Sequence, residues 1–403
     1  MEKSINNISE NITFNNKLIN LVIDFSREKN SQELKKITES LHSADLADLL
    51  TFLDSDQRSF LLSTLDKSKY TEVLSELDEN IFSETILKLK DDEVVRSISE
   101  METDDAVNLI ESLEPEEQKK LLAKVNPDDR ELIEESFNYP EDSAGRRMQK
   151  EFVSMPAFWS VGQAIDYLRE NSELPDDFFE IFIVDPSNKP IGSASVSKVL
   201  RSERNTKLDE ILDTSPKFIE ASMDQEEAAQ FFEQYSLVSA GVVDKHNRLI
   251  GRITADDIVW VLQEEAEEDI LRLGGVTESE TNKSIFRSTQ NRFVWLFVNL
   301  LTAILASYVI SLFDASIEKM VALAILMPIV VSMGANAGTQ TLTLTVRSLA
   351  TKELVDTNRK RIFFREILVS VLNGFIFAIL TAITAYLWFS HGGLSIIVGA
   401  AMI

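Results

Sequence analysis

Three long stretches without a charged side chain constrain this chain more than any other feature of its sequence. They cover residues 293–313, 320–346 and 367–390 and are 21, 27 and 24 residues long. A helix that crosses a membrane needs about 20 consecutive apolar residues. A fourth apolar run, 394–403, has only 10 residues, about half of a span. We therefore expect an α-helical transmembrane domain over 284–403, with three complete spans and a fourth that is cut short.

The negative charge of the chain lies before these spans. The formal net charge is −26, yet residues 284–403 contain nine basic and five acidic side chains, so the excess of acid lies entirely upstream. An acidic surface repels polyanions, which argues against nucleic acid as a partner. Basic residues crowd the loop after the second span, and such loops face the cytoplasm. We expect a multi-pass protein of the cell membrane, in contact with lipid, whose N-terminal domains are cytoplasmic.

An apolar residue recurs every 12 positions in the first third of the chain. The series is Leu41, Leu53, Leu65, Leu77, Leu89, Met101, Leu113, Val125 and Phe137. Each is followed by a polar cluster that supplies helix-capping residues, and two clusters place a proline early in the helix. This pattern predicts one short helix per repeat. Because such helices bury their apolar faces only by stacking, we expect an all-α superhelical domain over 31–138, after a flexible N-terminus over 1–30.

Two ten-residue segments share a second pattern further along the chain. IVDPSNKPIG (183–192) and VVDKHNRLIG (242–251) both contain V-D-x-x-N-x-x-I-G, 59 residues apart. In each segment an Asp/Asn turn joins a β-rich apolar run to another short strand, and an amphipathic helix follows. With the helices that precede each copy, this order of elements resembles a CBS domain pair, an α/β unit that we place at 139–255.

The resemblance to a CBS pair implies a candidate nucleotide site. CBS pairs often bind adenosine nucleotides, and Thr254 with Asp257 fits the family's Thr-x-x-Asp ribose position. The first copy departs from this pattern because it has Ser195 and Lys198 there. ATP or another adenosine nucleotide is therefore a candidate ligand at Thr254 and Asp257 only.

An acidic connecting helix is expected between the CBS pair and the membrane, over 256–283. Apolar residues at helical spacing form one face of TADDIVWVLQEEAEEDILRLGGV, which starts at Thr254. Like charges at positions i and i+4 cost about 0.2–0.5 kcal/mol per pair in an isolated helix. A divalent cation is thus a candidate partner for the other face, as an alternative to a solvated acidic surface. That face carries Glu264, Glu265, Glu267, Glu268 and Asp269.

The second apolar stretch contains polar and helix-breaking residues near its middle. It reads MPIVVSMGANAGTQTLTLTV from Met327, with Pro328, Gly334 and Gly338 among them. Backbone left unpaired at this depth costs several kcal/mol per group unless protein or a water-filled cavity satisfies it, so an interrupted helix would indicate an ion pathway. Amide and threonine oxygens suit a hard, hydrated cation. Close helix packing through the small residues is the structural alternative, and both can hold together.

The segment PIVVSMGANAGTQ is similar to the signature of MgtE-type magnesium transporters and channels. Ala335 stands where that signature usually has a second glycine. YPEDSAG at 139–145 and the order of helical domain, CBS pair, acidic helix and membrane part also resemble this family. The resemblance covers nearly all of the chain after about residue 30, and it identifies the protein as a member of a multidomain membrane family.

The resemblance implies a homodimeric channel that imports Mg²⁺ into the cytoplasm and is not an enzyme. At high internal Mg²⁺, ions would bridge carboxylates of the helical domain, the CBS pair and the connecting helix, and hold the pore shut. The family's fifth span carries an aspartate that anchors hydrated Mg²⁺, and this sequence ends before that span. Two alternatives stay open: a membrane-anchored CBS nucleotide sensor that transports nothing, and a transporter of Mn²⁺ or Co²⁺.

Individual residues match the family's functional positions. The family tends to have acidic groups where this chain has Asn108 and Trp260, so the resemblance implies a sensor with fewer ligands. Asn336 matches the signature asparagine. The candidate metal-binding residues are Asp104, Asp257, Glu264, Glu265, Glu268 and Asp269, and the candidate ion pathway comprises Gly334, Asn336, Gly338 and Gln340.

Overall fold

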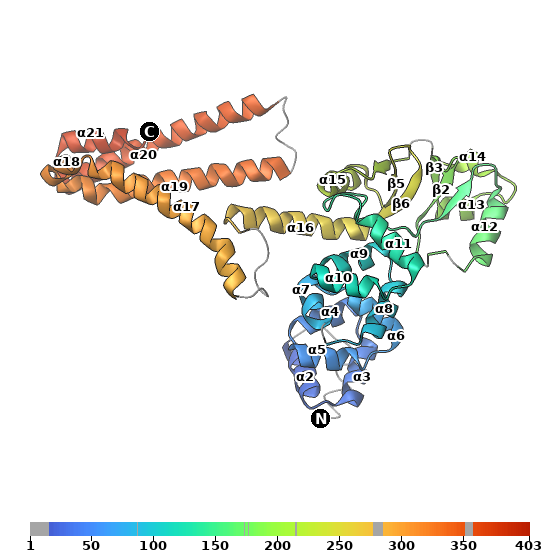
Figure 1. Cartoon of the computed structure of the whole chain (residues 1–403). Helices are drawn as coiled ribbons and strands as arrows, with labels where there is room; N and C mark the ends of the chain where they lie inside the picture. Colours follow the sequence, from blue (N-terminus) through green and yellow to red (C-terminus); the bar gives the residue numbers. More distant parts are fainter. Residues whose placement is uncertain are drawn as a thin grey trace. The chain divides into compact units, whose positions relative to one another are not determined.

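The computed structural model describes residues 16–86, 88–172, 174–175, 177–213, 216–276, 285–350 and 358–403. The chain divides into two compact units, the first ending at Gln263 and the second beginning at Glu264. Helix α16 (Ala255–Leu273) crosses this division (Figure 1). The helical array and the two small sheets belong to the first unit, and the apolar helices belong to the second.

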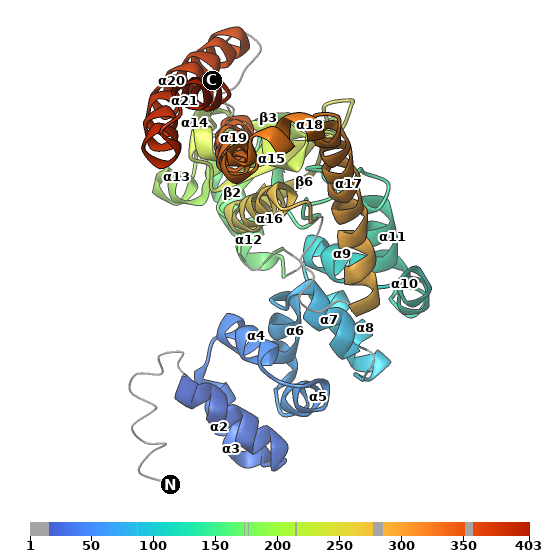
Figure 2. The same cartoon turned by 90° about the vertical axis from the view of Figure 1, so that its left-hand side faces the viewer.

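The first unit opens with an array of short helices that follow one another from α2 to α11 (Figures 1 and 2). From α4 onward, one helix lies between each two successive residues of the 12-residue series, which confirms the predicted repeat. Helices two apart contact each other, as α4 does α6 and α5 does α7, so the repeats stack as a superhelical array. The helices are α2 (Asn16–Arg27), α3 (Ser31–Ser40), α4 (Ser43–Thr51), α5 (Ser55–Leu62), α6 (Lys67–Ser75), α7 (Glu79–Ile86), α8 (Asp91–Glu100), α9 (Thr103–Glu111), α10 (Pro115–Leu122) and α11 (Pro127–Ser136).

The residues of the 12-residue series form the spine of the core in this array. Leu41, Leu53, Leu77, Leu113 and Val125 are buried, and the other four are partly buried against the same cluster. Capping follows the prediction at three helix starts, where the side chains of Asp54, Asp66 and Asn126 accept hydrogen bonds from backbone N–H groups of the first turn. Both early prolines occupy the first turn of their helices.

Helix α2 corrects the expectation of a flexible segment over 1–30. Leu18 and Val22 are 3% and 1% exposed, and Ser26 is buried as well. These residues are spaced by four, so they share one face of a helix and pack against the array. The expectation is wrong for residues 16–27, and residues 1–15 lie outside the described part of the chain.

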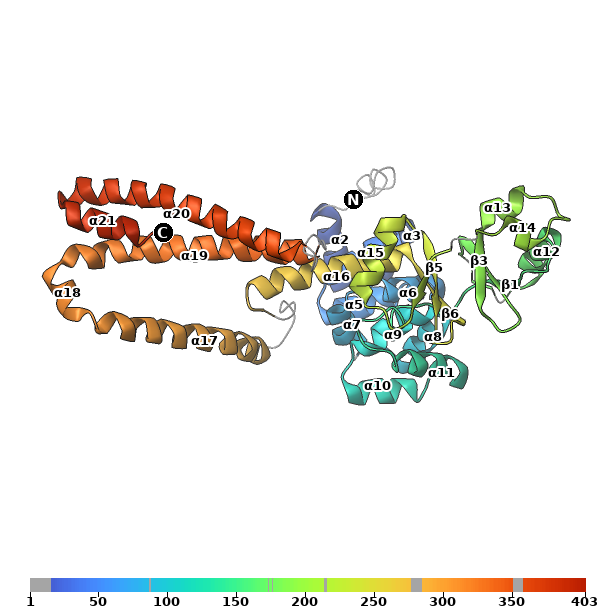
Figure 3. The same ribbon diagram turned by 90° about the horizontal axis from the view of Figure 1, so that it is seen from above.

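Two copies of a three-stranded sheet follow the array (Figure 3). In each copy the first strand is parallel to the second, and the second and third strands form an antiparallel hairpin. One sheet comprises β1 (Ser154–Pro156), β2 (Glu180–Val184) and β3 (Pro190–Ser195), and the other β4 (Phe218–Glu220), β5 (Ser239–Val243) and β6 (Leu249–Thr254). The accompanying helices are α12 (Val161–Glu170), α13 (Val196–Arg201), α14 (Leu208–Ile211) and α15 (Gln225–Tyr235).

The two hairpins have the same strand register, displaced by the 59 residues seen in the sequence. Glu180 pairs with Ser195 in the first copy, as Ser239 pairs with Thr254 in the second. Both copies of the repeat have an asparagine at the same turn position, Asn188 and Asn247. Their φ angles are positive, 60° and 58°, and asparagine tolerates such angles better than most residues. The repeat read from the sequence is thus one structural unit used twice.

The second unit consists of apolar helices. They are α17 (Ile285–Ser311), α18 (Asp314–Lys319), α19 (Val321–Ala350), α20 (Arg359–Phe389) and α21 (Gly392–Ala400). Within the described residues, three stretches are long and apolar enough to cross a membrane, namely Arg292–Ser311, Val321–Leu349 and Arg359–Phe389, which confirms the three predicted spans. Helix α18 joins α17 to α19 (Figure 3), and α21 packs with α19 and α20 around Leu326, Ala385, Leu394 and Val398.

Helix α19 runs through Pro328 without a break, so the expected interruption of the second span is wrong. A proline removes only one backbone donor, and membrane helices tolerate it where local adjustments satisfy the freed groups. The threonine hydroxyls donate to carbonyl oxygens one turn earlier, for example Thr339 to Ala335 at 3.1 Å and Thr343 to Thr339 at 2.9 Å. Each hydroxyl oxygen therefore keeps a free lone pair.

Small residues pack closely at a different place from the one expected. A Cβ atom built on Gly334 or Gly338 meets no described atom within 4 Å. On Gly399 of α21 it would lie 3.0 Å from the carbonyl oxygen of Ala378 and 3.1 Å from Cβ of Ala382, both on α20. The close contact through small residues thus joins α20 to α21, and the glycines of α19 present an open face within the described chain.

Candidate functional site

Two of the predicted metal-binding carboxylates meet in the first unit. Asp104 lies in the first turn of α9 and Asp257 in the first turn of α16. Asp104 is 3% exposed, and its carboxyl group lies close enough to that of Asp257 for the charge of Asp257 to raise its pKa. The fold therefore brings side chains 153 positions apart into one site, where the helical array contacts the second CBS copy.

Thr254 positions Asp257 by a local contact. The backbone N–H of Thr254 donates to Asp257 Oδ2 at 3.1 Å, and its hydroxyl donates to the same oxygen at 2.6 Å. Thr254 directly precedes α16 and Asp257 is the third helical residue, so these bonds form half of a capping box. The Thr-x-x-Asp pattern, which predicts a ribose contact, accordingly builds a helix start in this structure.

Gln149 lies between the two carboxylates. Its side-chain Nε2 donates to Asp257 Oδ2 at 3.2 Å and lies 3.4 Å from both Asp104 Oδ2 and Thr254 Oγ1. Gln149 is 2% exposed, and its own Oε1 accepts a hydrogen bond from Nε of Arg252 at 2.8 Å. This amide connects both carboxylates and Thr254 to Arg252.

Arg252 is the buried cation of the site. Its side chain is 4% exposed, and its guanidinium also donates to the carbonyl oxygen of Asp177 at 2.9 Å and to Glu102 Oε1 at 3.2 Å. Glu102 immediately precedes α9, whereas Arg252 lies on β6. Arg252 thus ties the helical array to the CBS pair without any added ion.

Further contacts dock α9 on the segment that leads into the CBS pair. The hydroxyl of Thr103 donates to Glu151 Oε1 at 2.6 Å. Arg147 donates to Asn108 Oδ1 on α9 at 3.0 Å and to Gln225 Oε1 on α15 at 2.9 Å. Asn108, where the resemblance implies an acidic group, is therefore used as a neutral acceptor for arginine.

Burial and mutual repulsion raise the pKa of the carboxyl groups at this site. Burial, followed by the charges of Asp257 and Asp105, holds the pKa of Asp104 well above its usual range. Burial, then Asp257 and Glu102, raises the pKa of Asp105 to about 8. Burial also raises the pKa of Asp257, although its hydrogen bonds from Thr254 act in the opposite direction. The site therefore favours protons or another cation over bare negative charge.

One oxygen of the site has no partner among the described residues. Asp104 Oδ1 is buried and accepts no hydrogen bond from any of them. An unpaired buried acceptor on a carboxylate fits the chemistry of a hard cation such as Mg²⁺, which binds through one or two carboxylates and keeps several waters. Across the described ranges, however, no three His, Cys, Asp or Glu side chains are arranged to hold a metal. The donor set fits a divalent cation, but the Gln149 amide group lies between the two carboxylates.

The other predicted sensor residues lie further along α16, about two to three turns beyond Asp257. Glu264 is exposed and Glu265 is half-buried. Glu268 forms an ion pair with Arg272. These residues belong to the second unit, whereas Asp104 and Asp257 belong to the first. A role for Glu264, Glu265, Glu268 and Asp269 in cation binding stays a prediction.

The predicted pathway residues divide between two faces of α19. Asn336 and Gln340 are four positions apart and share one face, and Gly334 and Gly338 share another. At 3.6 residues per turn, a step of two places the amide pair roughly opposite the glycine pair. The predicted pathway therefore divides into two candidate faces, and only the amide pair offers side-chain oxygens.

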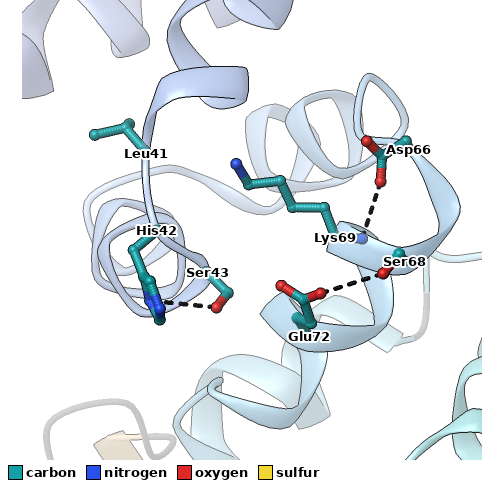
Figure 4. A pocket seen from close by; sticks show the side chains of 7 residues that line it. All are labelled: Leu41, His42, Ser43, Asp66, Ser68, Lys69 and Glu72. Atoms are coloured by element: carbon teal, nitrogen blue, oxygen red, sulfur yellow. Dashed lines mark hydrogen bonds between the residues drawn. The ribbon is translucent and has the colours of Figure 1, made fainter. Parts of the chain in front are cut away.

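A surface pocket in the helical array is a weaker candidate (Figure 4). Its polar side chains stabilise helix ends: Asp66 accepts from the backbone N–H of Lys69 at 3.0 Å, and Lys69 Nζ donates to the carbonyl oxygen of Thr38 at 2.6 Å. These contacts account for the pocket by local structure. Its lining residues are Leu41, His42, Ser43, Asp66, Ser68, Lys69 and Glu72.

Sequence reasoning missed four residues of the site: Glu102, Gln149, Glu151 and Arg252. Only Arg252 carried a signal. It occupies the position 59 residues after Ser193, so comparing the two CBS copies singles out a cation that only the second copy has. Gln149 carried none, because its contact with Arg252 joins residues 103 positions apart.

Comparison with known proteins assigns three parts of the chain. Residues 41–142 match the family model described as the MgtE intracellular N domain. Residues 208–264 match the CBS domain model, and residues 327–403 match the model described as a divalent cation transporter. The candidate carboxylates Asp104 and Asp257 fall in the first two regions, and Asn336 falls in the third.

Curated relatives named magnesium transporter MgtE match this chain along about two thirds of its length. The protein from Bacillus subtilis is 30% identical over 66% of this chain and 59% of its own length. Those from Enterococcus faecalis and Thermus thermophilus are 28% and 30% identical, over 67% and 68% of this chain and 60% and 61% of their own lengths. The chain thus spans about three fifths of the length of these relatives.

Two solved structures resemble the soluble part. The soluble part of a magnesium transporter has a TM-score of 0.56 at 23% identity, over 62% of this chain and 98% of that one, which shows a shared fold. The cytosolic domain of the Mg²⁺ channel MgtE in complex with ATP has a TM-score of 0.57 at 25% identity, over 60% of this chain and 99% of that one.

Proposed function

The chain belongs to the MgtE family of divalent cation transporters, and from this premise we propose that it imports Mg²⁺ into the cytoplasm under the control of cytoplasmic Mg²⁺. The observation that carries the proposal is the match of residues 327–403 to the divalent cation transporter model, which contains Asn336 on a membrane-spanning helix. The homologues' names support Mg²⁺ as the transported ion.

The membrane potential supplies the driving force for import. A negative interior contributes about 2.3 kcal/mol per charge per 100 mV, or roughly 4.6 kcal/mol for a divalent ion. The basic residues between spans support an orientation in which both soluble domains are cytoplasmic. In this proposal the protein is a homodimer in the cell membrane, and no step requires an enzymatic reaction.

Regulation would act through the carboxylates that meet in the first unit. Asp104 and Asp257 would hold the regulatory Mg²⁺, with Glu264, Glu265, Glu268 and Asp269 as further ligands along α16. The bound ion would supply positive charge to the raised-pKa carboxyl groups of Asp104 and Asp257. When it leaves, repulsion among the carboxylates weakens the contact between α9 and α16 and releases the pore.

An adenosine nucleotide is a second regulatory ligand in this proposal. The ATP complex of a structural neighbour supports it, and Thr254 with Asp257 is the candidate contact. Here both residues bond to each other and to Gln149, so a nucleotide would have to compete for these groups.

Uptake of Mg²⁺ tests the transport proposal. In bacteria that lack their own Mg²⁺ importers, expression of the complete gene product is expected to restore growth at low Mg²⁺ and raise cellular Mg²⁺. An excess of Mn²⁺ or Co²⁺ should compete weakly. Correctly inserted protein without uptake would favour a membrane-anchored nucleotide sensor, and tighter use of Mn²⁺ or Co²⁺ than of Mg²⁺ would change the assigned ion.

Limited proteolysis tests the regulatory part. Millimolar Mg²⁺ is expected to slow cleavage after the glutamates between Asp257 and Gly275, because cation binding neutralises like charges that loosen α16. The measurement is the cleavage rate of the full-length protein in detergent across a Mg²⁺ titration, with NaCl at matched ionic strength as the control. A rate that does not change with Mg²⁺ would contradict regulation through these carboxylates.

A further inference from the structure

The cation site proposed above contains an amide group where a cation would bind. Gln149 Nε2 donates to Asp257 Oδ2 at 3.2 Å and lies 3.4 Å from Asp104 Oδ2. The amide group supplies positive partial charge to two carboxylates that repel each other. Asp104 Oδ1, on a side chain that is 3% exposed, has no partner among the described residues and is the remaining acceptor of the site.

Arg252 fixes the orientation of this amide. A guanidinium can only donate, so the Gln149 oxygen that accepts from Arg252 Nε at 2.8 Å must be Oε1, and Nε2 must face the carboxylates. The backbone holds the residue as well, because Gln149 and Arg252 exchange backbone hydrogen bonds of 2.7 and 2.9 Å. Gly251 permits this approach, since an added Cβ would lie 2.8 Å from the carbonyl oxygen of Gln149.

An amide N–H₂ group cannot coordinate a metal ion, because it donates and has no lone pair to offer. A divalent cation bound by both Asp104 Oδ2 and Asp257 Oδ2 would therefore have to displace Nε2. Rotating the amide to offer Oε1 instead would break its bond to Arg252. Binding of a cation by these two oxygens and the present position of Gln149 exclude each other.

We propose that Gln149 is a built-in competitor of the regulatory cation and sets the Mg²⁺ concentration at which the site fills. The inference rests on the proposed regulation by Mg²⁺ and deepens it. Removing the competing N–H₂ group should lower the Mg²⁺ concentration needed, and replacing it with a third carboxylate should lower it further.

Two variants of Gln149 test this role. Gln149→Met keeps the side-chain volume and removes the donor, and Gln149→Glu keeps an acceptor for Arg252 while adding a ligand oxygen. We expect Gln149→Met to lower the half-saturating Mg²⁺ concentration about 5- to 30-fold, since one or two hydrogen bonds of about 1 kcal/mol each no longer compete. Gln149→Glu should lower it by at least as much. The readouts are protection from proteolysis and Mg²⁺ binding by calorimetry, both on the full-length protein in detergent.

Gln225 provides a matched control. It is also a buried glutamine, at 3% exposed, whose Oε1 accepts a hydrogen bond from an arginine, Arg147, at 2.9 Å. Gln225→Met removes a comparable contact, and we expect it to leave the Mg²⁺ midpoint unchanged. A folded Gln149→Met protein with an unchanged or higher midpoint would overturn the inference. A wild-type protein that binds no Mg²⁺ would instead overturn the regulatory proposal on which the inference rests.

Discussion

Replacing Asn336 with alanine is expected to reduce Mg²⁺ flux by about tenfold or more. The amide lies near the middle of the span Val321–Leu349, where water is scarce and the ion's hydration shell needs hydrogen-bonding partners. A hydrogen bond to a charged group contributes about 1.5–3 kcal/mol, and 1.4 kcal/mol corresponds to a factor of ten. The measurement is initial Mg²⁺ influx into vesicles that contain the complete gene product, normalised to inserted protein.

The two faces of α19 make this prediction specific. Gln340→Ala should also reduce flux, because Gln340 shares the face of Asn336. Asn299→Ala on α17 is the control, because it makes the same substitution in another span. Equal losses for Asn336→Ala and Asn299→Ala would indicate a general effect on folding. Undiminished flux in Asn336→Ala would remove this residue from the pathway.

Periodic features of the fold could be predicted from the sequence because local chemistry repeats there. The 12-residue series specifies both the buried residue and the cap that follows, so Leu53 and Asp54 together define a helix start. The CBS hairpins were predictable for a similar reason, since Asn188 and Asn247 mark the same left-handed turn position. The apolar spans follow from length and composition alone.

Features that depend on neighbouring atoms escaped prediction. Pro328 indicated a broken helix, yet the rest of α19 keeps its helical path because a single missing donor is a local defect. Helix α2 escaped notice because it precedes the 12-residue series, and its packing partners include α5 as well as the adjacent α3. Family resemblance pointed to Asp104 and Asp257, but their partner Gln149 became visible only in the folded structure, which brings distant segments together.

Arg252→Met is expected to produce the largest loss of stability in the first unit, about 2–4 kcal/mol in the free energy of unfolding. Removing one member of a buried ion pair typically costs 3–5 kcal/mol, and the lower range applies because Glu102 is 43% exposed. The variant also leaves Gln149 Oε1 and the carbonyl oxygen of Asp177 without their donor. The measurement is denaturant unfolding of the full-length protein in detergent, followed by tryptophan fluorescence.

Arg248→Met is the matched control, since Arg248 pairs with Asp244 on the surface beside the same strand and is 53% exposed. Arg248→Met should lower the free energy of unfolding by at most about 1 kcal/mol. Similar losses for both variants would show that Arg252 is not the link between the array and the CBS pair. If Arg252 is that link, its removal also frees the Gln149 amide to turn its oxygen toward Asp104 and Asp257. The destabilised variant should then respond to less Mg²⁺ than wild type, because the same guanidinium both docks α9 and directs the competing N–H₂ group at the carboxylates.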